Sequence, residues 1–538
     1  MNAPELLPCR AYTRIVPLRG RLPEGSGFVY RNAGTMNQRA VDERFCTAFC
    51  AYNSEIVSDD VIVVGDIESR RFLLLGALAA RRSLTHFAAV WRGRRLCEIR
   101  VMQPQLRDDD PDPEPLVELE GDDWRALLAE YGRRVLAELR AAPRDPLRPS
   151  VFGYCTWYYY YADVTERDLL ENVAALAAHR DAFPARYVQI DDGYQTFQGD
   201  WNDQDPSWPT PLRDIAATIR DAGMEAGIWT MPFHASTASR VFREHPDWFV
   251  QDGTGHPLVA KGWSPPPDDM WATLDTTRDD VLEHLRRIFR TFREWGYTYF
   301  KMDGLGFALL DGVRHDPAAT AVSAFRRGLQ AIREAVPDSF LLACSQHFLP
   351  CVGLVDGARF SDDTHASHAA IVRATECTLN RFWMFPWYEA DPDCLIARQD
   401  RGNVTAGEAR ISVLGGILTG FCLTSDNLRE MAPNRLGILS KAVSLRMRDV
   451  RPAYAARANE WPRLFLGTVD GAPACAVLNY ADDAFEVRKA DIEGMDPGCP
   501  FEELLAGAGR LPGDSFSVPA HDAWLVVQRP RETLFPVD

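Results

Sequence analysis

The chain has 538 residues, of which 46% are hydrophobic and 25% are charged, a globular composition with room for roughly three domains. Its formal net charge of −17 at pH 7 argues against nucleic acid or an anionic membrane as a partner, because both select basic surfaces. The first residues do not resemble a signal peptide, and the longest apolar run (72–80) is too short to span a bilayer. We therefore expect a cytoplasmic protein.

The twelve cysteines are scattered along the chain. Only Cys46 and Cys50 are close enough in sequence to suggest a pair, and no cysteines and histidines follow the spacing of a zinc site. We expect mostly reduced thiols in the core, in agreement with a cytoplasmic location.

Residues 1–148 are predicted to form a β-rich N-terminal domain with a linker helix. Short apolar runs such as 26–32, 60–66 and 86–91 read as strands separated by turns. Between residues 122 and 140 the apolar side chains recur at helical spacing. Three prolines follow that helix and indicate a domain boundary near residue 148.

Residues 149–451 are predicted to form a (β/α)8 TIM barrel, because eight short apolar runs alternate with amphipathic helices. The runs are 151–157, 186–192, 225–233, 297–304, 340–346, 357–363, 382–387 and 418–426. A doubly wound sheet is the competing topology, but no glycine-rich phosphate loop follows any run. Residues 452–538 return to strands and turns and predict a small C-terminal β-sandwich domain.

Acidic residues follow several of these predicted strands. In a barrel the strand ends form the active site, so acids from different strands converge on one rim. The rim is expected to hold Asp191, Asp192, Lys301, Asp303, Asp362, Asp363 and Asp426, together with Trp229 and Cys344. Each acid alone could cap a helix, but their concentration beside a lysine and aromatic rings indicates a pocket for a ligand rich in hydroxyl groups.

Two of these acids have the arrangement that a nucleophile and a proton donor require. Lys301 and Asp303 are two residues apart on a strand and share a face, so the ammonium group keeps the carboxylate ionised. Asp362 and Asp363 are neighbours, and crowding of like charges could raise the pKa of one of them. Glycoside hydrolysis requires one ionised and one protonated carboxyl group facing each other across a sugar ring.

The motifs that carry these residues resemble those of a known family. They are GYCTWYYYYADVTERDLLEN (153–172), YVQIDDGYQ and GDW (187–201), GIWTMPF and HPDW (227–248), LDTT (274–277), YFKMDG (299–304), CSQHFLPCVGLVDGARFSDD (344–363) and LTSDN (423–427). With these motifs in this order, residues 150–430 resemble the melibiase-type α-galactosidases of glycoside hydrolase family 36, related to raffinose-synthase-like enzymes.

The resemblance implies a role for each matching residue. Asp303 corresponds to the catalytic nucleophile and Asp363, four residues after Arg359, to the general acid/base. Asp191 and Asp192 correspond to acceptors for the 4- and 6-hydroxyls of galactose, and Lys301 to a donor beside the nucleophile. Trp229 would pack against the sugar and Cys344 would shape the pocket near its 2-position. Arg359, Trp201 and His347 complete the expected substrate-binding set.

The chain departs from the family pattern at several places. Gly304 replaces the phenylalanine that often follows the nucleophile, and Asp362 stands where many relatives have proline. Gln346 and His347 replace smaller residues, so we expect them to exclude a 2-acetamido group and to favour α-galactosides. The N-terminal domain is shorter than that of typical relatives, which leaves open whether the chain forms a homo-oligomer.

The resulting prediction is a retaining α-galactosidase that acts on a small carbohydrate substrate without a cofactor. His347, His365 and His368 lie near the rim, but no spacing of carboxylates and histidines requires a metal, and none is predicted. A galactosyltransferase using the same residues, or a retaining α-glycosidase for another sugar, is the alternative. A carbohydrate-binding pseudoenzyme is disfavoured because both aspartates and the lysine are present.

Overall fold

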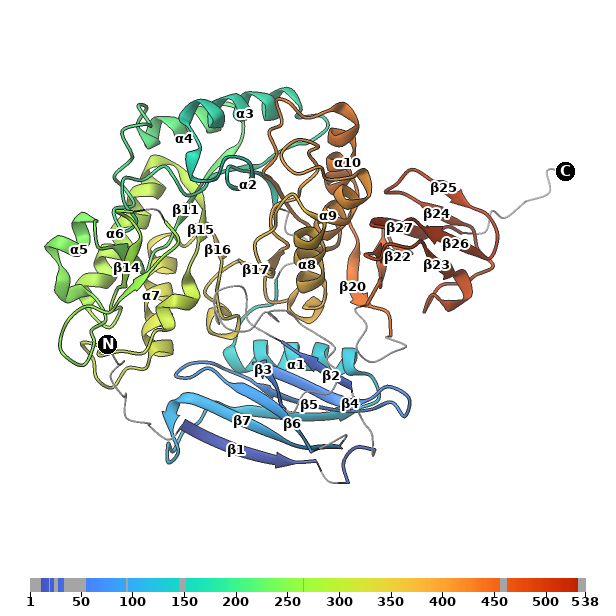
Figure 1. Cartoon of the computed structure of the whole chain (residues 1–538), viewed down its shortest axis with the longest axis horizontal. Coiled ribbons are helices and arrows are strands. Elements are labelled where there is room, and N and C mark those ends of the chain that lie inside the picture. The colour runs from blue at the N-terminus through green and yellow to red at the C-terminus, as the bar shows by residue number, and fades with distance from the viewer. Residues whose placement is uncertain are drawn as a thin grey trace.

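The computed structural model describes residues 11–18, 20–23, 28–32, 55–92, 95–144, 151–264, 266–454 and 462–530. Figure 1 shows a barrel with one group of strands below it and a second group beside it. Cys46 and Cys50 lie outside the described residues, and the cysteines within them are free thiols. None of the helices in the described ranges is long and apolar enough to cross a membrane.

The N-terminal strands form two four-stranded antiparallel sheets. One sheet has the order β1-β7-β6-β3 and the other β2-β4-β5-β8. The strands are β1 (Ala11–Pro17), β2 (Phe28–Arg31), β3 (Glu55–Asp59), β4 (Val61–Asp66), β5 (Arg71–Ala77), β6 (His86–Arg92), β7 (Arg95–Arg107) and β8 (Leu116–Gly121). Both faces of the second sheet are buried, because Ile62 and Val64 join the core between the sheets while Val61 and Val63 join the core shared with the barrel.

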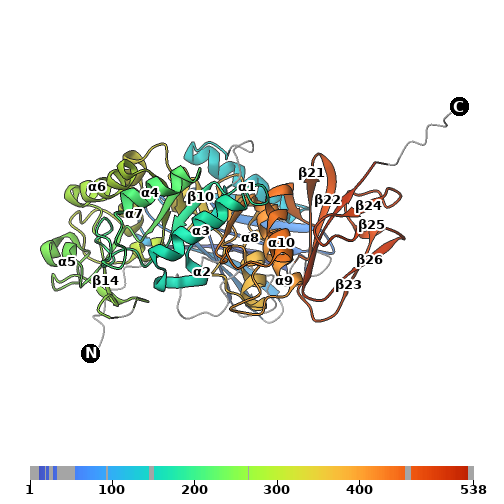
Figure 2. The same cartoon turned by 90° about the horizontal axis from the view of Figure 1, so that it is seen from above.

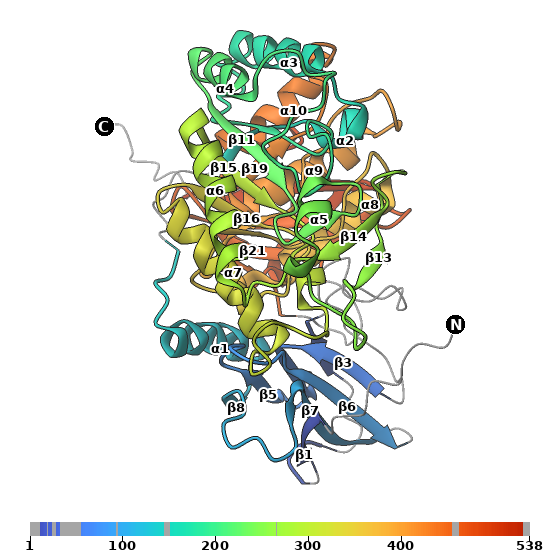
Figure 3. The same cartoon turned by 90° about the vertical axis from the view of Figure 1, so that its left-hand side faces the viewer.

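Helix α1 (Trp124–Leu139) connects the N-terminal sheets to the barrel and lies between them (Figure 3). The side chain of Asp123 caps the helix by accepting a hydrogen bond from the backbone of Arg125. Tyr131 joins the two parts: its hydroxyl donates to the carbonyl of Ala77 at 2.7 Å, and its ring lies 5.3 Å from that of Trp383. Helix α1 lies within residues 122–140, where the apolar spacing predicts a helix, whereas the boundary near residue 148 lies outside the described residues.

Eight parallel strands form the barrel that the sequence predicts. They are β9 (Val151–Cys155), β10 (Tyr187–Ile190), β11 (Glu225–Thr230), β15 (Tyr297–Met302), β16 (Phe340–Ala343), β17 (Gly357–Arg359), β18 (Glu389–Asp391) and β19 (Phe421–Thr424). They neighbour one another in sequence order, and β19 pairs with β9. On the other side, Leu395 donates a backbone hydrogen bond to Leu423 at 2.7 Å and closes the ring.

Helices surround these strands. They are α2 (Trp157–Tyr160), α3 (Glu166–Ala178), α4 (Leu212–Asp221), α5 (Arg240–Glu244), α6 (Asp279–Trp295), α7 (Ala321–Ala335), α8 (His368–Leu379), α9 (Ala406–Thr419) and α10 (Pro433–Ser444). Helix α6 ends at Gly296, which has a left-handed φ of 104°. A small antiparallel sheet of β12 (His234–Ser236), β14 (Met270–Thr273) and β13 (Val259–Lys261) follows the third barrel strand.

The seventh strand was predicted in the wrong place. Residues 382–387 begin with a short 3-10 helix, Phe382–Met384, and the strand is β18. The aromatic run is apolar because Trp383 and Trp387 pack against Tyr131 of α1, not because it crosses the barrel. The strand itself contains two acids, and its Glu389 is buried in an ion pair of 2.6 Å with Arg144. Such a strand has no apolar signature.

The C-terminal strands form a second, smaller sandwich at one end of the molecule (Figure 2). A six-stranded sheet has the order β20-β21-β22-β27-β24-β25, and β23 pairs with β26. The bounds are β20 (Arg448–Pro452), β21 (Leu464–Val469), β22 (Ala472–Asn479), β23 (Phe485–Arg488), β24 (Phe501–Glu503), β25 (Gly509–Leu511), β26 (Ser515–Val518) and β27 (Asp522–Gln528). Arg410 of α9 binds Asp522 of β27 through two hydrogen bonds of 2.7 Å and ties this sandwich to the barrel.

Candidate active site

A cavity of about 280 Å³ lies at the C-terminal ends of the barrel strands. It is lined by Trp157, Asp191, Asp192, Trp229, Trp263, Lys301, Asp303, Ser345 and Asp363. The structure therefore brings together six residues predicted from the sequence, which come from the ends of β10, β11, β15 and β17. Three carboxylates beyond the salt-bridged Asp191 give the cavity strong hydrogen-bond acceptors, and three tryptophans give it apolar faces.

Asp303 is held by three hydrogen-bond donors. Its Oδ1 accepts bonds of 2.7 Å from the hydroxyl of Ser345 and from the backbone N–H of Gly304. Its Oδ2 accepts a bond of 3.2 Å from the indole of Trp229. Burial alone would raise the pKa of Asp303, but the charges of Lys301 and Arg359 and these hydrogen bonds lower it below its usual value. The carboxylate is thus fixed in position and ionised.

Lys301 forms its ion pair with a different acid than Asp303. Its Nζ lies 3.0 Å from Oδ2 of Asp191, and both side chains are almost fully buried. Burial would lower the pKa of Lys301, but the charge of Asp191 raises it well above the usual value. Lys301 therefore stays charged, and its ammonium acts on Asp303 through the field across the cavity.

Asp192 has a different environment from its neighbour. Its Oδ1 accepts a hydrogen bond of 2.6 Å from Gln195, and its Oδ2 accepts a longer one of 3.4 Å from Gln198. Burial is the largest cause, and together with the negative charges of Asp191, Asp268 and Asp303 it raises the pKa of Asp192 to about 7. Asp192 can therefore exchange a proton near neutral pH.

The structure distinguishes the two adjacent acids after β17. Asp363 lines the cavity and accepts a hydrogen bond from Arg359, whereas Asp362 turns away and forms an ion pair of 2.6 Å with Arg373. Burial raises the pKa of Asp362, with Asp363 only a minor contributor. Crowding of like charges therefore raises the pKa of Asp362 only slightly, and Asp362 lies outside the cavity.

Arg359 lies beneath the cavity and not in it. Its side chain is 2% exposed, and besides Asp363 it binds Asp393 at 3.1 Å and the hydroxyl of Tyr158 at 3.3 Å. Arg359 is predicted to bind substrate, but in this structure its guanidinium bonds to protein groups and it is not among the lining residues. It orients Asp363.

Other predicted site residues do not line the cavity. Cys344 is fully buried, and its neighbour Ser345 faces the cavity in its place. Gln346 is buried and donates to the carbonyl of Arg359 at 3.1 Å, so it has no access to a 2-acetamido group. His347 is half-buried and is not among the lining residues. The steric argument for α-galactosides fails for Gln346, and the preference itself stays a prediction.

Asp426 does not belong to the rim acids either. It is fully buried, binds Arg398 at 2.8 Å, and accepts hydrogen bonds from the backbone of residues 397 and 398. Its partners come from the loop that follows the seventh strand. Asp426 therefore holds this loop in place. Its role is structural and not ligand-binding, in line with the alternative that an acid at a strand end serves as a cap.

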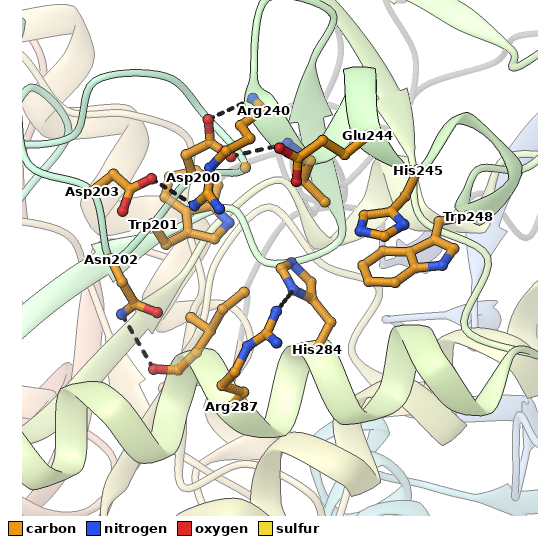
Figure 4. A pocket seen from close by; sticks show the side chains of 13 residues that line it. Asp200, Trp201, Asn202, Asp203, Arg240, Glu244, His245, Trp248, His284 and Arg287 are labelled. Carbon is orange, nitrogen blue, oxygen red and sulfur yellow. Dashed lines mark hydrogen bonds and ion pairs between the residues drawn. The ribbon is translucent and has the colours of Figure 1, made fainter.

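Trp201 lines a second cavity of about 230 Å³ (Figure 4) and contacts Trp229. The two indole rings meet edge to face at 5.6 Å, so Trp201 supports Trp229 without reaching the first cavity. In the second cavity His245 lies flat on Trp248, with ring centroids 3.8 Å apart. Burial, with the nearby charge of Arg287, lowers the pKa of His284 there to about 4.

Three lining residues were missed by the sequence analysis. Trp157 follows the first strand, where the aromatic run could have drawn attention to it. Ser345 has a left-handed φ of 54°, which the sequence does not reveal. Trp263 comes from the loop of the small sheet after the third strand and packs on Trp271 at 4.2 Å. No sequence signal connects this insertion to the cavity.

The departure at Gly304 has a local cause. Gly304 has a left-handed φ of 64°, and a Cβ at this position would lie 2.6 Å from Sδ of Met231. A side chain is therefore disfavoured by both the backbone conformation and the neighbouring methionine. The same backbone places the N–H of Gly304 on the carboxylate of Asp303.

The three histidines that the sequence places near the rim are separated in the structure. His365 packs edge to face on Tyr158 at 5.8 Å, and His347 lies in the loop after β16. His368 instead contacts Glu408 and His521, from α9 and the C-terminal sandwich. Their proximity in sequence therefore does not create a common site.

The Melibiase family model matches residues 141–304. The chain is 25% identical over 236 residues to the α-galactosidase of Escherichia coli, which covers 42% of this chain and 31% of that protein. It is 27% identical over 123 residues to the A type blood α-D-galactosamine galactosaminidase of Flavonifractor plautii, which covers 22% and 11%. The matched segments thus span less than a third of the length of these curated relatives.

Solved structures confirm the predicted fold over most of the chain. The α-galactosidase TtGalA from Thermus thermophilus, solved with p-nitrophenyl α-D-galactopyranoside, superposes with a TM-score of 0.65 at 24% identity. That superposition covers 85% of this chain and 93% of the other. The family match, the aligned relatives and the shared barrel agree with the motifs at the strand ends. Over residues 141–304 the chain is therefore similar to the Melibiase family, and its fold is that of solved α-galactosidases.

Proposed function

We propose that the protein is a retaining α-galactosidase that releases terminal α-linked galactose from small oligosaccharides. The observation that carries this proposal is the contrast between Asp303 and Asp363 in one cavity. Asp303 has a lowered pKa and three hydrogen-bond donors, whereas Asp363 is oriented by Arg359. A fixed nucleophilic carboxylate and a second carboxyl group in the same cavity are the two groups that double displacement requires.

In the first step Asp363 donates a proton to the glycosidic oxygen while Asp303 attacks the anomeric carbon. The bond between that carbon and the leaving oxygen breaks, the alcohol departs, and a glycosyl ester forms on Asp303. In the second step Asp363 removes a proton from water, whose oxygen attacks the anomeric carbon and releases the carboxylate. The product then has the same anomeric configuration as the substrate.

The remaining lining residues fit the recognition of a sugar. Asp191, Asp192 and Lys301 offer acceptors and a donor to ring hydroxyls. Trp229 and Trp157 offer apolar faces to the C–H groups of the ring. Because both kinds of group lie around one cavity, a single monosaccharide unit would satisfy them together.

Product analysis with melibiose and raffinose tests the proposal. We expect free galactose, initially as the α-anomer in NMR spectra, and no turnover by the Asp303→Asn variant. Free galactose released initially as the β-anomer would refute the retaining mechanism. No release from any α-galactoside would refute the substrate class.

Two alternatives are measured in the same experiment. Longer saccharides in the presence of excess acceptor sugar would show that transfer dominates over hydrolysis. Activity on an aryl α-galactosaminide equal to that on the aryl α-galactoside would favour the specificity named for the Flavonifractor relative, since Gln346 does not block the cavity.

A further inference from the structure

A cluster of two histidines and a glutamate lies where the barrel meets the C-terminal sandwich. His368 is the first residue of α8, Glu408 lies in the first turn of α9, and His521 lies in the turn between β26 and β27. One potential ligand atom from each residue lies within 4.8 Å of the other two. None of the three lines the candidate active site, so the cluster is separate from the proposed chemistry.

The hydrogen bonds of both histidines leave the same ring nitrogen available. Nε2 of His521 lies 2.8 Å from Oδ1 of Asp482, and Nε2 of His368 lies 3.3 Å from the carbonyl oxygen of Tyr480. A carbonyl accepts only, so His368 carries its proton on Nε2, and the carboxylate favours the same tautomer in His521. Histidines that bind metals are typically oriented in this way, by a carboxylate or a carbonyl on the second nitrogen.

The freed nitrogen of His368 has no hydrogen-bond partner within the described structure although it is buried. This Nδ1 lies 3.4 Å from Oε1 of Glu408, in poor geometry for a hydrogen bond from a protonated ring. The rings of His368 and His521 stack, with centroids 3.9 Å apart and 28° between their planes. Two imidazoles and a carboxylate oxygen are therefore gathered around a buried ring nitrogen that has no hydrogen-bond partner within the described residues.

Glu408 is held in place by its other oxygen. Its Oε2 accepts a hydrogen bond of 2.7 Å from the backbone N–H of Thr405, as part of a capping box, and Oε1 stays directed at His368. The neighbouring cations are already engaged: Arg410 binds both oxygens of Asp522, and Arg435 donates to backbone carbonyls. Glu408 and Asp482 supply two negative charges that would balance a divalent cation.

We propose that His368, Glu408 and His521 bind a zinc ion that ties the C-terminal sandwich to the barrel. Two imidazole nitrogens and one carboxylate oxygen are a regular zinc donor set, with water completing the tetrahedron. Bond lengths of about 2.0–2.1 Å place such donors about 3.3 Å apart. The His368–Glu408 pair already has nearly this separation, and His521 sits on a turn that can move toward it.

The test uses the untagged full chain, stripped with a chelator, and zinc alone as the probe. Equilibrium dialysis followed by metal analysis is expected to show one Zn²⁺ per chain. The His521→Ala variant should lose at least tenfold in affinity, and Asp482→Asn should lose about 10–100-fold because it removes only the orienting carboxylate. His256→Ala, at an exposed loop histidine, is the matched control and should bind zinc as the unchanged chain does.

Thermal unfolding separates binding from folding defects. Zinc should raise the thermal unfolding midpoint of the unchanged chain and of His256→Ala, but not that of His521→Ala. In the presence of chelator, all three proteins should unfold at similar temperatures. Absence of one bound zinc per chain at micromolar concentrations would overturn the proposal. Zinc affinities of His521→Ala and Asp482→Asn equal to that of the unchanged chain would overturn it as well, because the ion would then lie elsewhere.

Discussion

Ser345 donates a hydrogen bond of 2.7 Å to Oδ1 of Asp303 while its backbone holds a left-handed φ of 54°. A residue with a side chain pays about 1–2 kcal/mol for this conformation, and the conformation directs the hydroxyl into the cavity. The loop after the fifth barrel strand is thus strained where it meets the proposed nucleophile.

We expect Ser345→Ala to lower kcat about 10–100-fold with little change in KM. The variant loses a hydrogen bond to a charged group, which contributes about 1.5–3 kcal/mol. The pKa of Asp303 should rise, since this hydrogen bond is among the interactions that lower it, and the acid limb of the kcat/KM profile should move to higher pH. Ser345→Gly should be equally slow but more stable than Ser345→Ala by about 1 kcal/mol, because glycine accepts the left-handed backbone. If Ser345→Gly keeps full activity, the hydroxyl does not support the nucleophile.

Asp363 and Asp362 should differ in how their loss depends on the leaving group. General acid catalysis contributes about 10²–10⁴-fold, and only when the departing oxygen needs a proton. Asp363→Ala should therefore lose hydrolysis of melibiose but still release nitrophenol in a rapid burst. Asp362→Ala breaks the ion pair with Arg373 outside the cavity and should give a milder loss that is equal for both substrates. A burst confined to Asp362→Ala would reassign the acid.

Asp303→Ala should be nearly inactive on every α-galactoside, whatever the leaving group, because no covalent intermediate can form. Added azide or formate should restore measurable turnover by occupying the space of the missing carboxylate. Substantial activity without such an anion would contradict the double-displacement mechanism.

Asp192→Asn should raise the thermal midpoint at pH 8 relative to the unchanged chain. In the folded protein the pKa of Asp192 is raised to about 7 from 3.8, so the unfolded chain loses this proton first as pH rises. The destabilising contribution of Asp192 to the free energy of unfolding is absent below pH 4, grows between pH 4 and 7, and reaches its full size above pH 7. The full destabilisation is about 4 kcal/mol, since each unit of pKa is worth about 1.4 kcal/mol.

Asp191→Asn is the control with the opposite sign. Asp191 neutralises the buried ammonium of Lys301, and its loss leaves that charge without its partner. The midpoint should therefore fall at pH 8. Two outcomes would contradict the effect of buried charge on stability. The first is a shift of the thermal unfolding midpoint in the same direction by Asp191→Asn and Asp192→Asn. The second is an effect of Asp192→Asn that is the same at pH 4 and pH 8.

Gly304→Ala should lower both stability and activity. The left-handed φ costs a residue with a Cβ about 1–2 kcal/mol, and the new carbon would meet Met231 at 2.6 Å. Relief of either strain shifts the N–H that binds Asp303. Gly253→Ala has open space around its Cβ and should have almost no effect on the thermal midpoint or on kcat. Equal behaviour of the two variants would show that Gly304 is not constrained.

The sequence by itself determined the order of the barrel strands and the acids at their ends. Each strand of the sheet is a short apolar run between amphipathic helices, so its position follows from local hydrophobic pattern. The motif ending in Asp303 and the pair Asp191-Asp192 were placed at the cavity on this basis, and the structure brings them together. The seventh strand is the exception, because it contains two acids, and Glu389 is stabilised by Arg144 from a distant segment.

Only the tertiary structure decided which neighbours face the cavity. The directions of Asp363 and Asp362 depend on Arg359 and Arg373, which lie on different elements. Ser345 replaces Cys344 because of a single left-handed residue. His368, Glu408 and His521 come from three segments, with 40 residues between the first two and 113 between the last two, so no local spacing could reveal the cluster. Hydrophobic periodicity is a local property of the chain, whereas charge pairing and side-chain direction depend on contacts that form only when distant segments pack.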